Sequence, residues 1–490
     1  MADYHYLACD LGAESGRVLL GSFENGRITL REIHRFANGP VHIGGTLRWD
    51  FLRIFEELKL GLKKAADCKV PVSSVSCDSW GVDYALLSGG EPLLALPFHY
   101  RDARTDGAME RAFAVVPADE IFAETGIQFM PLNTLYQLYI DLQTRPGILD
   151  LATQFLNVGD YFNFLLSGCA AAEESLASTT QLYNPRARAW SAMLMERFGF
   201  PARIFPRIVP SGTPLGPMAD PVAEETGLAG AQVIAGCSHD TAAAVAAVPA
   251  EGAEWAYISS GTWSLLGIEN ATAMIGPRSR QYNFTNEVGF GGSIRFLKNI
   301  VGLWLIQECR REWAIRGQEC GYEELARMAG EAEPLKTFID PMEQSFLKPG
   351  GMPEKIAGFC RASGQAVPAT PGAIVRTALE SLALLYRRTL DQLEDASGRS
   401  LTTLHIVGGG SRNHLLNQCT ANATRRAVLA GPAECTGLGN ILVQAMALGH
   451  IPSITAARAV VRESFPLSRY QPADGRQWEE AYHRYLKLAG

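Results

Sequence analysis

The sequence has no excess of positive charge and no long apolar run. Its 44 Lys and Arg face 51 Asp and Glu, which gives a formal net charge of -7. Such a chain has no overall positive field to attract phosphate backbones or anionic lipid. No segment approaches the roughly 20 apolar residues of a membrane helix, and residues 1–5 lack the charged and apolar regions of a signal peptide. We therefore expect no nucleic-acid partner, no membrane partner and a cytoplasmic location.

The sequence also lacks cysteines with the spacing of a metal site. Its 10 cysteines lie almost entirely inside apolar or strand-like runs, and no two are separated as in a CxxC motif. We expect reduced core residues, because a large chain in a reducing compartment has little need of disulfides. A disulfide between distant members such as Cys68 and Cys237 stays open at this point.

The chain is too long for one hydrophobic core. It has 490 residues, of which 47% are hydrophobic and 19% charged, a composition that excludes a largely disordered protein. Single cores usually stop growing well below this length, so we expect two domains, or three at most. We predict an N-terminal domain over residues 1–246, a C-terminal domain over 247–452 and a terminal segment with a helix over 453–490.

Two segments share one plan, in which an apolar strand, a glycine turn and a second apolar strand follow each other. The first surrounds residues 10–17 and the second surrounds residues 259–264. Strands alternate with helices after each of them, as with the predicted helix over 52–66 and the strand over 72–77. We interpret the pair as an internal duplication. The predicted fold class is α/β, with two similar domains and a nucleotide between them.

Both glycine turns carry groups that suit phosphate. The first offers backbone N–H groups, a hydroxyl, the cation of Arg17 and the carboxylate of Asp10, which is able to hold hydrated Mg²⁺. The second offers hydroxyls and backbone donors. Each turn alone is also explained as an ordinary turn, but a triphosphate held by two domains needs both. Residues 408–410 are three glycines after a predicted strand, which favours close approach of a flat or phosphorylated ligand without completing a dinucleotide motif.

Residues 238–241 lie between a predicted buried strand and a predicted Ala-rich helix. Unpaired N–H groups and the dipole at a helix start favour an ionised carboxylate there, so Asp240 is a candidate to accept a hydroxyl proton. Helix capping is the alternative explanation. His239 is either a core residue or a donor to a substrate.

Two further strand ends, at residues 80–83 and 100–102, combine aromatic, glycine and charged residues. This composition suits the binding of a polyol, and a solvated loop with a buried tryptophan is the alternative. The proline-rich stretch over 205–221 is predicted to be irregular surface chain.

Taken in order, these segments resemble the FGGY carbohydrate kinases of the actin, Hsp70 and hexokinase superfamily. The resemblance is carried by residues 9–18, 30–36, 78–83, 100–102, 126–129, 133–138, 238–241, 259–265, 297–300, 302–305 and 405–410. It implies two ribonuclease H-like domains facing a central cleft, with ATP and Mg²⁺ bound there. It also implies transfer of the γ-phosphoryl group to O1 of a ketose.

Segments 78–83 and 238–241 favour the branch of this family that acts on L-rhamnulose over those that act on glycerol or xylulose. Another ketose such as L-fuculose is the first alternative, because one stereocentre is read by one or two hydrogen bonds. An actin- or Hsp70-like ATPase and a non-catalytic sugar sensor are alternatives of other classes. The partners are then a small ketose and ATP, and the protein is expected to be a monomer or a small homo-oligomer.

The resemblance and the motifs together give the candidate site residues. Asp240 is the candidate base, and Asp10 is the candidate metal ligand, through water. Glu14 departs from the family pattern, in which a small or hydroxyl residue is common, so a negative charge stands near the expected phosphates. The remaining candidates are, for ATP, Ala13, Glu14, Ser15, Gly16, Arg17, Thr262, Gln307, Gly409 and Gly410, and, for the sugar, Gly81, Asp83, His239, Asp240, Thr241 and Asn299.

Overall fold

The computed structural model describes residues 3–145 and 147–489, and the chain divides into two compact units. Unit 1 contains Met1–Pro249, Glu269–Phe296 and Cys435–Ser464, and unit 2 contains Ala250–Ile268, Leu297–Glu434 and Phe465–Gly490. The units follow packing rather than chain order, because the segment 435–464 returns to unit 1. The domain boundaries at 246 and 452 remain predictions.

Unit 1 is built on a six-stranded sheet in the order β14-β15-β6-β1-β2-β3. Strands β1, β2 and β3 form an antiparallel meander, whereas β6 and β15 continue the sheet parallel to β1. The sequence predicts a third strand over 27–33 and hence a meander, and both this meander and the predicted strand over 72–77 are confirmed. The bounds are β1 Tyr4–Leu11, β2 Ser15–Glu24, β3 Arg27–Ala37, β6 Val72–Ser79, β14 Thr213–Pro217 and β15 Gln232–Ala235.

The edge strand β14 corrects one prediction. It lies inside the proline-rich stretch that we expected to be irregular, and it pairs antiparallel with β15. Pro214 and Pro217 both lie in this strand. Proline has no N–H to donate and is tolerated within a sheet mainly at its edge. The prolines that make this segment look irregular in the sequence therefore also explain why the strand lies at the edge.

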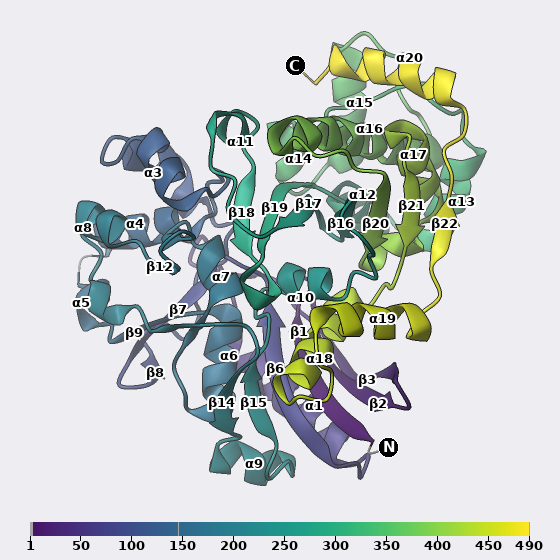
Figure 1. The fold of residues 1–490 in the computed structure, drawn as a ribbon. Helices are drawn as coiled ribbons and strands as arrows, with labels where there is room; N and C mark the ends of the chain where they lie inside the picture. Colours follow the sequence, from purple (N-terminus) through teal and green to yellow (C-terminus); the bar gives the residue numbers. More distant parts are fainter. Residues whose placement is uncertain (1–2, 146, 490) are drawn as a thin grey trace. The chain divides into compact units, whose positions relative to one another are not determined.

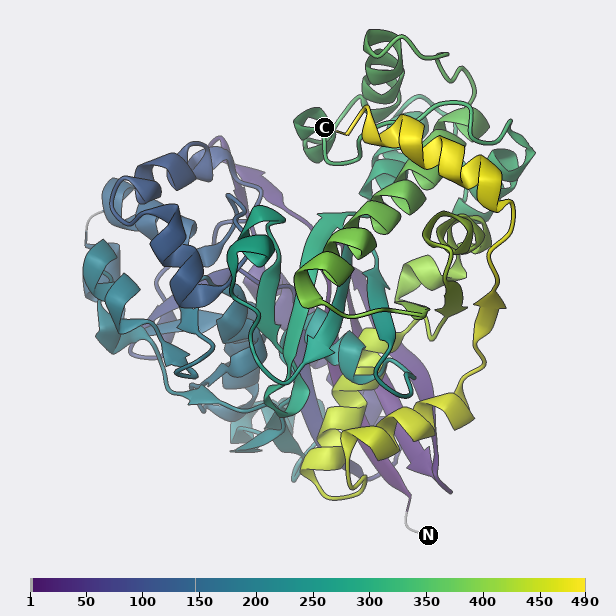
Figure 2. The same cartoon turned by 45° about the horizontal axis from the view of Figure 1, so that its top comes forward.

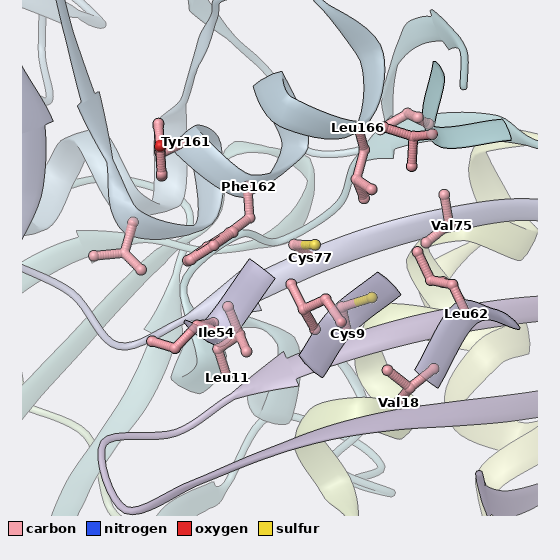
Figure 3. Close-up of a cluster of buried hydrophobic side chains, with 14 of the residues drawn as sticks. Cys9, Leu11, Val18, Ile54, Leu62, Val75, Cys77, Tyr161, Phe162 and Leu166 are labelled. Atoms are coloured by element: carbon pink, nitrogen blue, oxygen red, sulfur yellow. The ribbon is translucent and has the colours of Figure 1, made fainter. Parts of the chain in front are cut away.

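Helices α1 (Phe51–Ala66) and α6 (Val158–Ser167) cover one face of this sheet. Figure 3 shows Ile54 of α1 and Phe162 of α6 directed toward Cys9 and Cys77 of the strands. The helix predicted over 52–66 is confirmed, and Asp50 caps it by accepting a hydrogen bond from the amide of Arg53. All ten cysteines are free thiols, seven of them buried.

Helix α18 (Cys435–Ala447) lies on the other face, with α10 (Asp240–Ala246) packed against it. Figure 1 shows this yellow-green helix, which comes late in the chain, beside the purple strand β1. A Cβ at Gly439 of α18 would lie 1.7 Å from the carbonyl oxygen of Ala243 in α10. The two helices therefore approach as closely as they do because this position has no side chain.

The rest of unit 1 lies mainly around a smaller three-stranded sheet, β8-β7-β9, and a second hydrophobic core. The sequence pattern predicts a mostly helical stretch from 103 to about 197, and the structure confirms it. The elements are β4 Val41–Ile43, β5 Thr46–Arg48, β7 Tyr84–Ser88, β8 Glu91–Pro92, α2 Ala108–Phe113, α3 Ala118–Thr125, α4 Thr134–Thr144, α5 Ile148–Leu151, β9 Gln154–Asn157, β10 Ala172–Glu173, α7 Glu174–Thr179, β11 Tyr183–Asn184, β12 Ala189–Trp190, α8 Ala192–Phe198, β13 Ile208–Val209, α9 Asp220–Thr226, α11 Pro277–Gln281, β18 Thr285–Val288 and α19 Ile454–Ser464.

The sheet of unit 2 repeats the strand plan of unit 1. The sheet has seven strands in the order β18-β19-β17-β16-β20-β21-β22, of which β18 and the start of β19, up to Phe296, are counted with unit 1. As β1 does with β2 and β6, β16 pairs antiparallel with β17 and parallel with β20, and β20 continues parallel to β21. This confirms the predicted duplication and the predicted α/β fold class. The bounds are β16 Trp255–Ser260, β17 Trp263–Asn270, β19 Ile294–Val301, β20 Thr403–Val407, β21 Ala427–Ala430 and β22 Ser468–Tyr470.

The sequence predicts a long helix over 371–396, which α16 (Pro371–Ser397) confirms, and this helix organises the helices of unit 2. Figure 2 shows it beside the yellow C-terminal helix α20 (Gly475–Leu486). Arg387 of α16 reaches Glu479 of α20 at 2.9 Å. The other helices are α12 Trp304–Ile315, α13 Tyr322–Glu331, α14 Gln344–Leu347, α15 Met352–Ala362 and α17 His414–Thr424, and short 3-10 turns occur at Ala103–Thr105, Ala202–Ile204, Phe290–Gly292 and Gly409–Arg412.

Among the described residues, none of the helices has both the length and the apolar character needed to cross a membrane.

We predict that Gly439→Ala lowers the midpoint of thermal unfolding, because the added methyl group collides with the backbone of α10. Overpacking of this kind costs about 1–3 kcal/mol or more. The matched control is Gly358→Ala, which also lies inside a helix, α15, but has no atom within 4 Å of the added Cβ. That variant should be stabilised by about 0.5–1 kcal/mol, since alanine is the better helix former. Equal unfolding midpoints for the two variants would contradict the packing argument.

Candidate active site

Three carboxylates gather at the strand ends of unit 1. Asp10 of β1 and Asp78 of β6 are directly opposite each other in the parallel pairing. The backbone of His239, just before α10, bridges to Ser79 at the end of β6. Asp240 follows as the first residue of α10. Open α/β sheets bind their ligands at such carboxyl ends of parallel strands.

Asp10 forms an ion pair with Arg17, its cross-strand neighbour on β2. The turn between them is closed by a hydrogen bond from the amide of Gly12 to the carbonyl oxygen of Ser15, at 3.0 Å. Glu14 has an exposed side chain at the tip of this turn. Ala13 and Ser15 flank it, half-buried. The predicted Asp10, Arg17 and glycine-turn residues are therefore brought together.

Gly16 lies where β2 approaches Phe36 of β3. A Cβ at this position would come within 2.1 Å of the Phe36 ring. Packing against Phe36 is enough to explain why residue 16 is a glycine, with no need of a ligand. A contact between its backbone and a phosphate therefore stays a prediction.

The side chain of Asp240 is 30% exposed, and its two oxygens have different surroundings. Oδ1 accepts hydrogen bonds from the amide and the hydroxyl of Thr241, at 2.5 and 3.0 Å. The Nε2 atom of His239 lies 3.4 Å from the same oxygen. Oδ1 is thus occupied by the protein's own donors, and Oδ2 is the oxygen left to meet a substrate hydroxyl.

The pKa of Asp240 departs from our expectation of a firmly ionised group. Desolvation inside the protein, followed by repulsion from Asp10, raises this pKa to about 7. These effects outweigh the helix start, since α10 has only 7 residues. His239 occupies the N-cap and makes no side-chain cap bond, but Asp240 itself accepts from the first-turn amide of Thr241, so part of the capping alternative holds. A carboxyl that titrates near neutrality is well matched to proton transfer.

A buried glutamate and serine hold the segment before Asp240. Glu173 Oε2 accepts from the amide of Ser238 at 3.0 Å, and Ser175 Oγ accepts from the amide of His239 at 3.1 Å. The Ser175 hydroxyl donates in turn to Glu173, at 2.5 Å. Burial raises the pKa of Glu173 to about 7. Glu173 is not among the residues predicted from the sequence, although two adjacent glutamates within an apolar stretch are a signal for it.

Asp78 was likewise missed. It is fully buried, and Asn440 of α18 donates to its Oδ2 at 2.5 Å. Burial and the nearby charge of Asp10 hold the pKa of Asp78 well above its ordinary value. Its other oxygen, Oδ1, has no hydrogen-bond partner among the described residues.

The aromatic strand end at residues 80–83 does not present its acid as expected. Asp83 is fully buried, and its Oδ2 accepts from the indole N–H groups of Trp49 and Trp80 at 2.6 and 3.0 Å. Gln137 donates to Oδ1 at 3.0 Å. The carboxyl therefore organises aromatic side chains, and its contact with the sugar stays a prediction. Gly81 beside it is half-exposed, and a Cβ there would lie 3.0 Å from the Thr179 hydroxyl.

The remaining candidates lie in unit 2. The carbonyl oxygen of Thr262 accepts from the amides of Gly302 and Trp304, both at 3.2 Å, so the turn after β16 is fixed to the start of α12. Gln307 lies on α12, and its Oε1 is buried without a hydrogen-bond partner among the described residues. Asn299 lies half-buried on β19.

The triple glycine after β20 has two different causes. At Gly408 and Gly410 a Cβ would meet Ser260 at 2.9 and 2.0 Å, so both are small because β16 lies against them. Gly409 has nothing within 4 Å of such a Cβ. The open position, Gly409, is the one that suits a ligand, and a contact of Gly410 with ATP stays a prediction.

The donors around Asp10 suit a hydrated cation rather than a directly caged one. Among the described residues, no group of three His, Cys, Asp or Glu side chains could hold a metal ion. Mg²⁺ typically keeps several waters and uses one or two carboxylates together with substrate phosphates. A carboxylate such as Asp10 fits that mode of binding.

Two family models match the chain. The N-terminal domain of the FGGY family of carbohydrate kinases matches residues 5–247, and the C-terminal domain of the same family matches residues 256–448. The chain belongs to the FGGY family of carbohydrate kinases. The resemblance inferred from the sequence is thereby confirmed, and the protein is a sugar kinase.

Curated relatives cover nearly the whole chain. A rhamnulokinase of Bacteroides thetaiotaomicron is 41% identical over 478 residues, which is 98% of each chain. A rhamnulokinase of Enterococcus faecalis is 42% identical over 469 residues, or 95% of this chain and 94% of the relative.

Solved structures of FGGY kinases share the fold. A ligand-bound xylulose kinase from Lactobacillus acidophilus superposes with a TM-score of 0.82 over 99% of this chain and 97% of that chain, at 14% identity. Plasmodium falciparum glycerol kinase with ADP gives a TM-score of 0.79 over 99% of this chain and 98% of that chain, also at 14% identity. The two-domain fold predicted from the sequence is therefore confirmed.

We predict that Glu173→Gln flattens the pH dependence of stability. Because the folded protein raises this pKa from 4.5 to about 7, stability present below pH 4.5 is lost as the pH rises through 7. The loss amounts to up to about 3 kcal/mol. Glutamine mimics the protonated acid, and the hydroxyls of Ser175 and Ser211 are able to turn and accept from its amide.

Unfolding of wild type and variant should be measured at pH 5 and pH 8, with the exposed Glu224→Gln as control. The Glu173 variant should gain stability relative to wild type on going to pH 8. A difference between the two proteins that is the same at both pH values would rule out the assignment.

Proposed function

We propose that this FGGY kinase transfers the γ-phosphoryl group of ATP to O1 of L-rhamnulose, as a step of rhamnose catabolism. The observation that carries the proposal is the placement of Asp240, with Oδ1 occupied and Oδ2 free for a hydroxyl, in a chain 41% identical to a rhamnulokinase. L-Fuculose is the alternative ketose. The relatives do not favour the ATPase or the sugar sensor.

Asp240 is the proposed general base. As O1 of the ketose attacks the γ-phosphorus, its proton passes to Oδ2 of Asp240. The bond between that phosphorus and the bridging oxygen breaks, and its electron pair leaves with ADP. Charge in such a transition state lies mostly on the phosphoryl oxygens, so alignment and hydrogen-bond donors supply most of the rate. The base adds a further factor of about 10² to 10⁴.

ATP is assigned to Ala13, Glu14, Ser15, Gly16 and Arg17 of unit 1, and to Thr262, Gln307, Gly409 and Gly410 of unit 2. Support comes from the exposed turn after β1, the cation of Arg17 and the open position at Gly409. Asp10 would hold Mg²⁺ through water. When bound, the ion neutralises charge on the phosphates.

The sugar is assigned to Gly81, His239, Thr241 and Asn299, in addition to Asp240. The first three lie near strand ends of unit 1, where His239 and Thr241 flank the base. We further propose a cytoplasmic enzyme, a monomer or a small homo-oligomer, with domains over 1–246 and 247–452 and a terminal segment over 453–490.

A coupled assay of ADP release over a panel of ketoses tests the substrate. We expect saturable activity with L-rhamnulose and little with L-fuculose or D-xylulose. Faster turnover of another ketose would replace L-rhamnulose in the proposal. ADP release that is independent of any sugar would favour the ATPase.

Asp240→Asn tests the base. We expect the variant to bind ketose and ATP normally, measured by calorimetry, while kcat falls by about 10²- to 10⁴-fold. The matched control is Asp220→Asn, because Asp220 is also the first residue of a 7-residue helix, α9, but is exposed. It should turn over like wild type. Near wild-type kcat in Asp240→Asn would remove Asp240 from the mechanism.

A further inference from the structure

A fully buried arginine lies behind the candidate base. Arg295 of β19 has no exposed surface. Its Nε and Nη2 atoms donate to the carbonyl oxygen of Val288, at 3.2 and 3.1 Å. Glu287 Oε2 is 3.2 Å from Nη2 and balances the charge. A buried ion pair contributes little net stability to a fold. Stability alone therefore does not explain why Arg295 and Glu287 are paired here.

The backbone makes room for this arginine. A Cβ at Gly289 would lie 3.2 Å from Cγ of Arg295 and 2.7 Å from the Ser293 hydroxyl. The guanidinium is therefore seated in one position by β18, β19 and the turn between them.

From that position, Arg295 Nη2 also contacts Nδ1 of His239, at 3.0 Å. A guanidinium has donors only and stays protonated in proteins. The Nδ1 atom of His239 must therefore offer its lone pair. A neutral imidazole with an unprotonated Nδ1 carries its proton on Nε2. Burial and the Arg295 charge also keep the pKa of His239 well below its ordinary value, which agrees with a neutral ring.

The other ring nitrogen faces the base. Nε2 of His239 is 3.4 Å from Oδ1 of Asp240, the oxygen that already accepts from Thr241. With its proton on Nε2, the imidazole adds a donor on this side of the carboxylate. With the proton on Nδ1, two acceptors would face each other there.

We propose that Arg295 is a positioning residue that fixes His239 in the Nε2-protonated tautomer, so that the ring orients Asp240 with Oδ2 toward the ketose hydroxyl. This inference rests on the proposed function for the role of Asp240, but the tautomer itself does not depend on turnover.

Glu287 supplies the competing arrangement. Its Oε2 is 3.5 Å from Nδ1 of His239, so a proton on Nδ1 would be directed to this carboxylate. The Arg295 contact is shorter, and it excludes that proton. The two arrangements give opposite protonation of the ring and are separable by one measurement.

The test is a long-range ¹H–¹⁵N correlation spectrum of the full-length enzyme with ¹⁵N-labelled histidine. His239 is assigned among the 9 histidines by the loss of its signals in His239→Asn. We expect an unprotonated Nδ1 and a protonated Nε2 in the wild-type protein at neutral pH. A protonated Nδ1, or an imidazolium, overturns the proposal without need of any variant.

Two matched variants then identify what fixes the ring. Glu287→Gln keeps the Arg295 donor, so the tautomer should be unchanged. Arg295→Met combined with Glu287→Gln removes the donor without leaving a buried carboxylate unpaired, so the signals should shift toward a mixture of tautomers. A changed tautomer in Glu287→Gln, or an unchanged one in the folded double variant, would assign the effect to another group.

Kinetics separates this proposal from the proposed function. In the double variant we expect kcat to fall by about 10- to 100-fold, as for a slightly misplaced catalytic group, with the KM for ATP unchanged. A wild-type kcat in the double variant contradicts the positioning role. If Asp240→Asn remains fully active while the wild-type tautomer is as expected, the base assignment fails but the Arg295–His239 contact stands.

Discussion

The hydrogen bonds from the amides of Ser238 and His239 to Glu173 and Ser175 determine where the segment that leads to the candidate base lies. An irregular segment between a strand and a short helix has unpaired backbone donors, and burying them unpaired costs about 1–3 kcal/mol each. Side chains from β10 and α7 satisfy those of Ser238 and His239. Since Asp240 directly follows His239 in the chain, these hydrogen bonds also fix the position of its backbone. Backbone contacts thus place the candidate base, while Thr241 and His239 contact its carboxyl directly.

Burial sets the electrostatics of this region. Asp78, Glu173 and Asp240 all have raised pKa values, and desolvation is the first cause for each. Helix α10 is short, so the partial charge at its start does not reverse this effect. The result is that Asp240, the candidate base, has a pKa of about 7, next to a histidine whose pKa is held well below its ordinary value. An aspartate with an ordinary, low pKa would be a weaker base. A positively charged histidine beside it would lower the pKa of the aspartate further.

The sequence predicted those elements in which several local signals indicate the same structure. Strands β1, β2 and β16 and helix α16 were predictable because apolar spacing and glycine or proline at their ends indicate the same structure. Strand β14 was missed because prolines at a sheet edge look like loop. For Asp83, the sequence cannot show that two indole N–H groups donate to Oδ2 and that the Gln137 amide donates to Oδ1. Glu173 and Arg295 were missed since both act through contacts more than fifty positions away.

The duplicated strand plan carries different chemistry in its two copies. In unit 1 the paired strand ends carry carboxylates, Asp10 on β1 and Asp78 on β6. In unit 2 the corresponding ends, of β16 and β20, carry Ser260 and the glycine of position 408. Carboxylates repel phosphate, whereas hydroxyls and glycine amides are able to donate hydrogen bonds to it at close range. Carboxylates are therefore concentrated at the strand ends of one copy, where Arg17 offsets part of the negative charge, and the corresponding ends of the other copy carry neutral groups.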